Sequence, residues 1–169
     1  KQDARFNDGK VDRRGRLWAG TMTFEGASSA LYRMSPNLTV KKMVDEVTIS
    51  NGIGWSPDNK IMYYVDSLRY VINAFDYDIT TGSISNQRPF VQMDAAFGTP
   101  DGLTVDCKGY VWCAISGGWK VIRFAPDGHA SAEIKMPVSM PSSCMFGGKD
   151  LDELYITTIS NVLTEEEKA

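Results

Sequence analysis

The sequence predicts an all-β protein. Short runs rich in β-branched and aromatic residues recur along the chain, and each run ends at a turn signal. Outside the charged C-terminal tail, no window of a dozen residues carries the 3.6-residue period of an amphipathic helix. The predicted strands cover residues 16–22, 30–34, 60–67, 71–78, 102–106, 110–116, 120–126 and 153–158. Turn signals stand between them at 12–15, 57–59, 80–82, 107–109 and 126–128.

A repeat narrows this class to a β-propeller. Each copy has a polar lead residue, a turn-opening residue five positions later and an apolar strand residue six positions after that. The lead residues are Asn7, Asn51 and Asp101, and the turn-opening residues are Asp12, Ser56 and Asp106. The apolar strand residues are Trp18, Met62 and Trp112. The lead residues are 44 and 50 positions apart, which is the length of a four-stranded propeller blade.

A looser fourth copy starts near Ser143. A β-sandwich would also show short strands at regular spacing, but it does not require a repeat in register. We therefore expect a single partial β-propeller domain over residues 1–169, with repeats starting near residues 7, 51, 101 and 143.

The propeller prediction gives the three lead residues a common location. The innermost strand of each blade lies beside the central channel, so equivalent positions near the starts of these strands meet around one axis. Asn7, Asn51 and Asp101 should then converge at one mouth of the channel. The alternative is that Asn-Gly and Asp-Gly are only tight turns, which these dipeptides favour because they tolerate positive φ.

One carboxylate with two amide oxygens is a donor set for hard cations. It suits Ca²⁺, Mg²⁺ or Mn²⁺, with water filling the remaining positions, and Zn²⁺ could also occupy it. Arg5 lies two residues before Asn7 and should share its face of the strand, where it could hold a polar ligand. Glu25 could reach over the mouth from its loop, whereas Asp8 is interpreted as a turn or backbone cap.

Composition and charge exclude several other classes of function. The net charge is −3 and the basic residues do not cluster, which argues against nucleic-acid binding. The apolar runs are far shorter than a membrane span. His129 is the only histidine, so a thiolate–histidine zinc site or a Ser-His-Asp triad is not expected. Three cysteines without a pairing framework fit a reducing compartment, and we expect a cytoplasmic protein.

Several motifs together resemble one family. The segments "RFNDGKVD", "LWAGTM", "ISNGIGWS", "YYVDS", "PDGLTVD" and "SSCMFGGKDLDELYIT" are similar to those of the SMP-30/gluconolactonase/regucalcin-like family, which includes insect luciferin-regenerating enzymes. The resemblance covers nearly all of the chain. It implies a six-bladed propeller with one divalent cation, most often Ca²⁺, at the channel mouth, and hydrolysis of sugar lactones or related lactones and esters.

The resemblance also implies roles for single residues. Asn51 of "SNG" and Asp101 of "PDG" correspond to metal ligands. In a lactone hydrolase we expect Asp101, next to the metal and water, to act as general base as well. Arg5 and Asn7 of "RFND" correspond to residues that contact substrate or metal-bound water, and Glu25 to a sugar contact in a loop that looks shorter here.

The family pattern is incomplete in this chain. Its remaining metal ligand is a glutamate of an "EGP"-type motif in the first blade, and no matching segment occurs here. We therefore expect only about three to four blades. Three functions remain open: a metal-dependent lactone hydrolase or part of one, a calcium-binding regulatory protein with little or no catalysis, and an inactive truncation.

Overall fold

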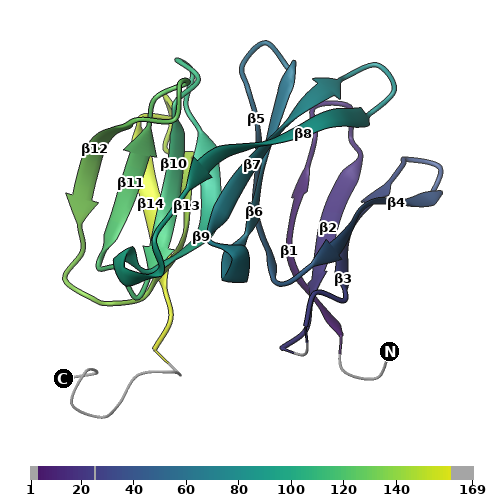
Figure 1. Ribbon diagram of the computed structural model, residues 1–169. Helices are drawn as coiled ribbons and strands as arrows, with labels where there is room; N and C mark the ends of the chain where they lie inside the picture. The colour runs from purple at the N-terminus through teal and green to yellow at the C-terminus, as the bar shows by residue number, and fades with distance from the viewer. Residues whose placement is uncertain (1–3, 25, 161–169) are drawn as a thin grey trace.

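The computed structural model describes residues 4–24 and 26–160. Within these residues the chain forms three four-stranded sheets and one two-stranded sheet (Figure 1). All strand pairs are antiparallel, and each sheet follows the order of the chain. The prediction of a partial β-propeller is therefore confirmed. Glu25 and the charged tail after residue 160 lie outside the described residues.

The blades follow one another along the chain. The first blade contains β1 (Arg5–Val11), β2 (Leu17–Met22), β3 (Ser29–Met34) and β4 (Val40–Val47). The second contains β5 (Ser50–Trp55), β6 (Ile61–Asp66), β7 (Val71–Asp78) and β8 (Ser83–Gln92). The third contains β9 (Thr99–Val105), β10 (Val111–Ser116), β11 (Lys120–Phe124) and β12 (Ala130–Lys135). The two-stranded sheet is β13 (Pro141–Gly147) with β14 (Glu153–Thr158), and two 3-10 turns are η1 (Ser67–Arg69) and η2 (Ala95–Phe97).

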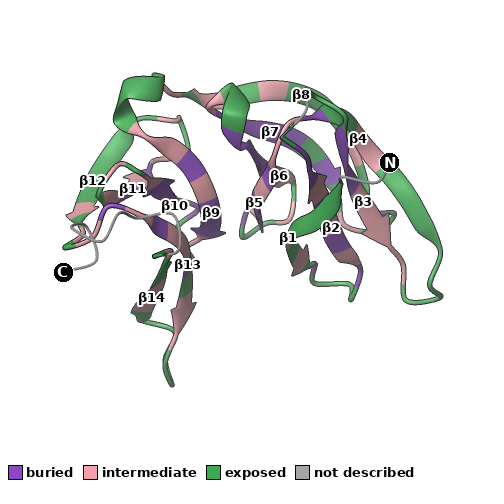
Figure 2. Cartoon of the chain, turned by 90° about the horizontal axis from the view of Figure 1, so that it is seen from below, coloured by how far each residue is buried: buried purple, intermediate pink, exposed green. Residues whose placement is uncertain are grey.

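The first strand of each blade lies on the inside of the arrangement. β1 packs against β5, β5 against β9, and β9 against β13. Figure 2 shows β1, β5 and β9 toward the middle, with β4, β8 and β12 at the outside. No helix in the described part of the chain has the length and apolar composition that a membrane crossing requires.

The core consists of layers between neighbouring blades. Trp18 and Leu31 of the first blade pack with Ile53 and Tyr64 of the second. A second layer joins Tyr63 and its neighbours in the second blade to the third blade, and a smaller one joins the third blade to β13. Side chains alternate between the two faces of a strand, so β6 and β7 can fill both neighbouring layers. This explains why five of the six residues of β6 and six of the eight residues of β7 are buried.

The repeated turn residues close the inner hairpins. Asp12 accepts hydrogen bonds from two backbone amides of its turn and from Trp18 Nε1, the last at 3.0 Å. Asp106 does the same with its own turn and with Trp112 Nε1, also at 3.0 Å. Ser56 accepts from two turn amides through its hydroxyl. The prediction that these three residues open turns is confirmed. Each aspartate also bonds directly to the tryptophan six residues later in the sequence.

Candidate functional site

The site is built where the innermost strands of three blades begin. Asn7 stands near the start of β1 and Asn51 near the start of β5. Asn7 Nδ2 donates to Asn51 Oδ1 at 2.8 Å and to the carbonyl oxygen of Ser50 at 2.8 Å. Two side chains separated by 44 residues in sequence are therefore in direct contact.

A second set of contacts joins Asn51 to the third blade. Asn51 Nδ2 donates to the Ser67 hydroxyl oxygen at 2.8 Å. The Ser67 hydroxyl in turn donates to the carbonyl oxygen of Pro100 at 2.8 Å. Ser67 is buried in η1, and Pro100 directly precedes Asp101 in β9. The hydrogen-bond chain from Asn7 to Pro100 thus positions the starts of β1, β5 and β9 relative to one another.

Asp101 lies in β9, one blade along from Asn51. A Cβ atom placed on Gly52 would lie 2.6 Å from the amide nitrogen of Leu103 and 2.7 Å from the carbonyl oxygen of Asp101. Only glycine permits this close approach of β5 to β9. Gly52, the residue after Asn51, therefore allows the Asp101 backbone to lie close to β5. The "SNG" motif therefore also serves the packing of the two inner strands.

The carboxyl group of Asp101 is held in an unfavourable environment for its charge. Burial raises the pKa of Asp101 to about 7, and the negative charge of Asp8 adds to the effect, while a hydrogen bond from the Gly102 amide opposes it. The side chain is partly buried. The site thus contains a carboxyl group whose ionised form is disfavoured by burial and by the like charge of Asp8.

Asp8 and Lys10 extend the polar lining along β1. Asp8 Oδ1 accepts from the Gly9 amide at 2.7 Å, next to an irregularity in the β1–β2 register between Phe6 and Gly9. Burial raises the pKa of Asp8, against the effects of the Gly9 bond and of Lys10. Lys10 Nζ donates to the carbonyl oxygen of Leu103 at 3.0 Å, which links β1 to β9 directly. The sequence pattern did not indicate Lys10. It indicated a turn residue or a backbone cap at Asp8; Asp8 lies within β1 and not in a turn, but its bond from the Gly9 amide is that of a backbone cap.

The remaining predicted site residues are Arg5 and Glu25. Arg5 Nη1 donates to Asn7 Oδ1 at 3.2 Å and to the Phe6 carbonyl oxygen at 3.0 Å. Its guanidinium therefore shares the face of Asn7, although both residues are exposed. Glu25 lies outside the described residues, so its predicted role stays a prediction.

The donor set fits a hard cation better than a soft one. Among the described residues, no three His, Cys, Asp or Glu side chains are grouped as metal ligands. Asn51 Oδ1 and the Asp101 carboxylate are oxygen donors, the type that Ca²⁺, Mg²⁺ and Mn²⁺ prefer. An amide oxygen has two lone pairs, so Asn51 can accept from Asn7 and still offer a ligand atom. A cation here would also balance the charges of Asp101 and Asp8.

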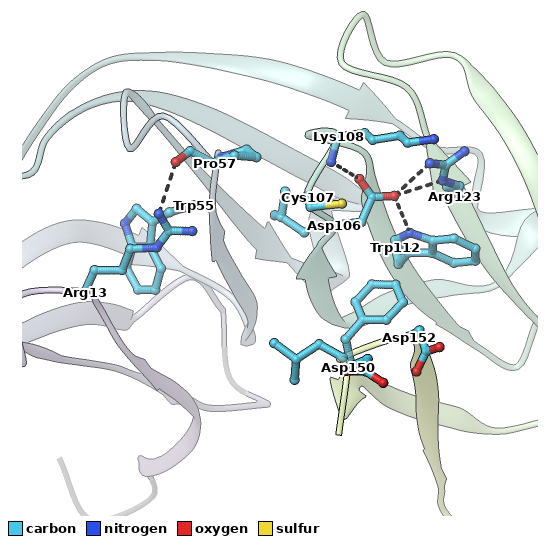
Figure 3. A pocket seen from close by; sticks show the side chains of 13 residues that line it. Arg13, Trp55, Pro57, Asp106, Cys107, Lys108, Trp112, Arg123, Asp150 and Asp152 are labelled. Carbon is cyan, nitrogen blue, oxygen red and sulfur yellow. Dashed lines mark hydrogen bonds and ion pairs between the residues drawn. The ribbon is translucent and has the colours of Figure 1, made fainter. Parts of the chain in front are cut away.

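A hollow lies at the opposite ends of the same inner strands. Its volume is about 810 Å³, and it is lined by turn residues of all four sheets, including Arg13, Pro57, Lys108 and Asp150 (Figure 3). The Asp106 carboxylate at its wall is already bound by Trp112 and Arg123. None of the predicted site residues lines this cavity, so it is separate from the candidate site.

Comparison with known proteins places these observations in a family. Residues 1–160 match the family described as "SMP-30/Gluconolactonase/LRE-like region". The chain is 47% identical over 165 residues to regucalcin of Oryctolagus cuniculus. The aligned region covers 93% of this chain and 55% of that protein. The chain thus spans about half the length of this curated relative.

Two solved structures show the same fold at similar coverage. A calcium-binding protein, regucalcin, from Agrobacterium tumefaciens superposes with a TM-score of 0.92 at 28% identity, over 97% of this chain and 56% of that one. A gluconolactonase from Xanthomonas campestris superposes with a TM-score of 0.78 at 28% identity, over 90% of this chain and 54% of that one.

Proposed function

The chain belongs to the SMP-30/gluconolactonase/LRE-like family, and from this we propose that it is a hydrolase of sugar lactones or related lactones and esters that depends on a divalent cation, or part of such an enzyme. The observation that carries the proposal is the arrangement at the starts of β1, β5 and β9. There, Asn7 and Asn51 are in contact, and Ser67 joins them to the residue before Asp101.

Asn51 and Asp101 are the residues proposed to hold the cation. Ca²⁺ is the first candidate, and Zn²⁺, Mn²⁺ and Mg²⁺ are alternatives, because the donors are oxygen atoms with few protein charges. A bound divalent cation would supply Lewis-acid polarisation of the substrate carbonyl. The first-blade glutamate that the family resemblance implies would have to come from outside this sequence.

Asp101 is also proposed to act as the general base. Burial raises the pKa of Asp101 to about 7 in the metal-free protein, and a bound divalent cation would lower it, so that the carboxylate is ionised and able to accept a proton at neutral pH. Its carboxylate would accept a proton from the attacking water.

Arg5 would orient substrate hydroxyl or carbonyl groups through the N–H groups of its guanidinium. Both N–H groups of the Asn7 amide already bond Ser50 and Asn51, so Asn7 would accept from a substrate hydroxyl or from metal-bound water through Oδ1. Glu25 is proposed as a further contact to the substrate.

A calcium-binding regulatory role with little or no catalysis is the second candidate. It is favoured by two similar proteins, the regucalcin of Oryctolagus cuniculus and the calcium-binding protein of Agrobacterium tumefaciens. The same residues, Asn51 and Asp101, would hold the ion. The two candidates therefore differ in turnover and not in the location of the site.

The test is hydrolysis of glucono-1,5-lactone by a complete version of the propeller, which includes this chain and the first-blade glutamate, with Ca²⁺, Mg²⁺, Mn²⁺ or Zn²⁺ supplied singly, beside a calorimetric titration of each ion. Turnover should require a cation, and Asp101→Ala should abolish turnover and weaken ion binding together. Asp127→Ala is the matched control, because the Asp127 side chain is 70% exposed and pairs with His129 in a distant turn.

Binding without turnover would support the regulatory candidate. An Asp101→Ala variant that keeps both properties would overturn the assignment of this residue.

A further inference from the structure

Lys10 carries a positive charge from the first blade to the third. Its Nζ atom donates to the carbonyl oxygen of Leu103 at 3.0 Å, although the two residues are 93 positions apart in sequence. Lys10 lies on β1 and Leu103 on β9, and Figure 2 shows β5 between these two strands. The side chain therefore extends past the inner strand that carries Asn51.

The acceptor of this bond belongs to the backbone segment that holds the candidate site together. A Cβ atom on Gly52 would lie 2.6 Å from the Leu103 amide nitrogen and 2.7 Å from the Asp101 carbonyl oxygen. Lys10 is therefore bonded to the stretch of β9 that packs directly against the residue after Asn51. Because this packing leaves no space for a side chain, the backbone sets the position of the ammonium relative to both proposed ligands.

Asp8 is a charged neighbour of both Lys10 and Asp101. Among the residues that the structure describes, Lys10 is the cation whose charge acts on Asp8. The negative charge of Asp8 acts in turn on Asp101, where it adds to burial in raising the pKa. Burial lowers the pKa of Lys10, and attraction to Asp8 opposes this effect. Two carboxylates and one ammonium, all partly buried, therefore act on one another at the site.

The fourth sheet adds a neutral group beside the ammonium. Cys144 of β13 is buried, and burial raises its pKa to about 11, although the positive charge of Lys10 opposes this effect. The Cys144 thiol is therefore uncharged at neutral pH and does not balance the ammonium. A charge that is partly removed from water acts more strongly on nearby ions than one that water surrounds.

We infer that Lys10 is a positioning residue that sets the strength of the cation site, because its positive charge offsets one of the two carboxylates. This inference rests on the proposed function and deepens it. Like charges repel, so the ammonium weakens the binding of a divalent cation at Asn51 and Asp101. The same charge makes the loaded site more positive, which favours the negative charge that develops on the carbonyl oxygen of a lactone or ester during hydrolysis.

Calorimetric titration of Ca²⁺ into the complete propeller tests this role. Methionine keeps the length and the apolar body of lysine but removes the charge. We expect Lys10→Met to bind Ca²⁺ about tenfold more tightly and to hydrolyse glucono-1,5-lactone about tenfold more slowly at saturating Ca²⁺. Lys10→Arg keeps the charge and should bind Ca²⁺ as the wild type does. Lys41→Met removes an exposed charge on β4 and is the matched control, with no change expected.

Asp8→Asn provides a second test that keeps the bond from Lys10 to Leu103. It removes one carboxylate, so Ca²⁺ affinity should fall about tenfold, and the double variant with Lys10→Met should return toward the wild-type affinity. Asp45→Asn, at an exposed position on β4, is its control and should leave the affinity unchanged. An affinity that Asp8→Asn does not lower would overturn the inference.

The direction of the change separates this role from a structural one. If Lys10 only ties β1 to β9, Lys10→Met should weaken Ca²⁺ binding and slow turnover together. That result, or an unchanged affinity, would overturn the inference and leave the proposed function in place. If neither the wild type nor Lys10→Met binds Ca²⁺, the proposed function fails and the inference fails with it.

Discussion

At the scale of single residues, Asp101 and Ser67 carry the chemistry and the geometry of the candidate site. Asp101 has a partly buried carboxylate near a second one, Asp8, and burial with this like charge raises its pKa to about 7. A group placed in this way opposes folding whenever it is ionised. Natural proteins retain such residues where function requires them.

The first prediction follows from the raised pKa of Asp101 in the metal-free protein. The folded state holds the Asp101 proton more tightly than the unfolded state, so stability falls as pH rises from about 4 to about 7. Without screening by solvent, this pKa difference between the folded and unfolded states corresponds to about 4 kcal/mol of free energy. Because Asp101 is only partly buried, we expect Asp101→Asn to stabilise the metal-free protein by about 1–2 kcal/mol at pH 8.

Thermal unfolding at pH 4 and pH 8, with and without Ca²⁺, measures this effect. The variant should exceed the wild type at pH 8, match it at pH 4 and gain nothing from Ca²⁺. A variant less stable than the wild type at pH 8 would contradict the account of Asp101.

The second prediction concerns the Ser67 hydroxyl, which bridges Asn51 and the Pro100 carbonyl oxygen. Ser67→Ala removes the partner of the buried Pro100 carbonyl oxygen and of the partly buried Asn51 amide, and we expect a loss of about 1–3 kcal/mol in the free energy of unfolding. Because Asn51 is then free to rotate, the affinity for Ca²⁺ should fall about tenfold. Calorimetry of Ser67→Ala beside Ser131→Ala, whose hydroxyl bonds Arg123 at an exposed position, tests this. Lower stability with unchanged affinity would limit Ser67 to a structural role.

At the scale of elements, the inner hairpins depend on their aspartates. Burial alone would raise the pKa of Asp12, but hydrogen bonds from Trp18, Arg16 and Tyr77 outweigh it and hold the pKa below the usual value. Arg16 also reaches the Ile79 carbonyl oxygen at 2.5 Å, so this turn fastens the first blade to the second. The turn around Asp106 repeats the contact within the third blade through Arg123.

The third prediction compares these two aspartates. The Arg16 and Asp12 side chains are 7% and 1% exposed, whereas Arg123 and Asp106 are 23% and 12% exposed. Asp12→Ala should therefore lower the free energy of unfolding by about 3–5 kcal/mol and Asp106→Ala by clearly less, since breaking a buried pair leaves an unpaired charge. The depressed pKa means that the contribution of Asp12 is present above about pH 4 and is lost as pH falls further. Chemical denaturation at pH 7 and pH 3 checks both statements, and equal losses in the two variants would contradict them.

The fourth prediction concerns the contact between β5 and β9. Gly52→Ala would bring a methyl group within 2.7 Å of backbone atoms of β9, whereas the atoms nearest to a methyl group at Gly54 are side-chain carbons of Leu103 and Val105, at 2.8 and 2.9 Å. We expect Gly52→Ala to cost about 3 kcal/mol or more and Gly54→Ala about half as much, because backbone cannot move aside as side chains can. Denaturant unfolding of the two variants side by side measures this difference, and a harmless Gly52→Ala would contradict the close approach.

Elements with a strong apolar pattern could be predicted from the sequence, and the outer strands could not. β6 and β7 are buried on both faces, so their composition identifies them. β4 and β12 lie at the outer edges and are mostly exposed, with sequences VKKMVDEV and ASAEIK that carry no clear pattern. Their pairing depends on the hairpin before them and not on their own side chains.

At the scale of the whole molecule, the repeat brings together residues far apart in sequence. Asn7, Asn51 and Asp101 occupy equivalent positions in the repeat, which predicted a common location for them. Asn7 and Asn51 are in contact, and Asp101 lies on the next inner strand. The repeat could not predict Ser67 or Lys10, because neither occupies a repeated position. Their partners, Asn51 and the Leu103 carbonyl oxygen, become neighbours only when the blades assemble. The roles of Arg5, Asn7, Asn51 and Asp101 stay predictions.

Paramagnetic broadening by Mn²⁺ tests most directly whether these residues share one cation site. In an amide NMR spectrum of the 169-residue chain, substoichiometric Mn²⁺ should broaden the resonances of Asn7, Asn51 and Asp101 first, and excess Ca²⁺ should restore them. The turn residues Asn59 and Lys108, at the opposite ends of the inner strands, should stay sharp. Broadening centred on those turns, or none that Ca²⁺ reverses, would contradict a cation site at the starts of β1, β5 and β9.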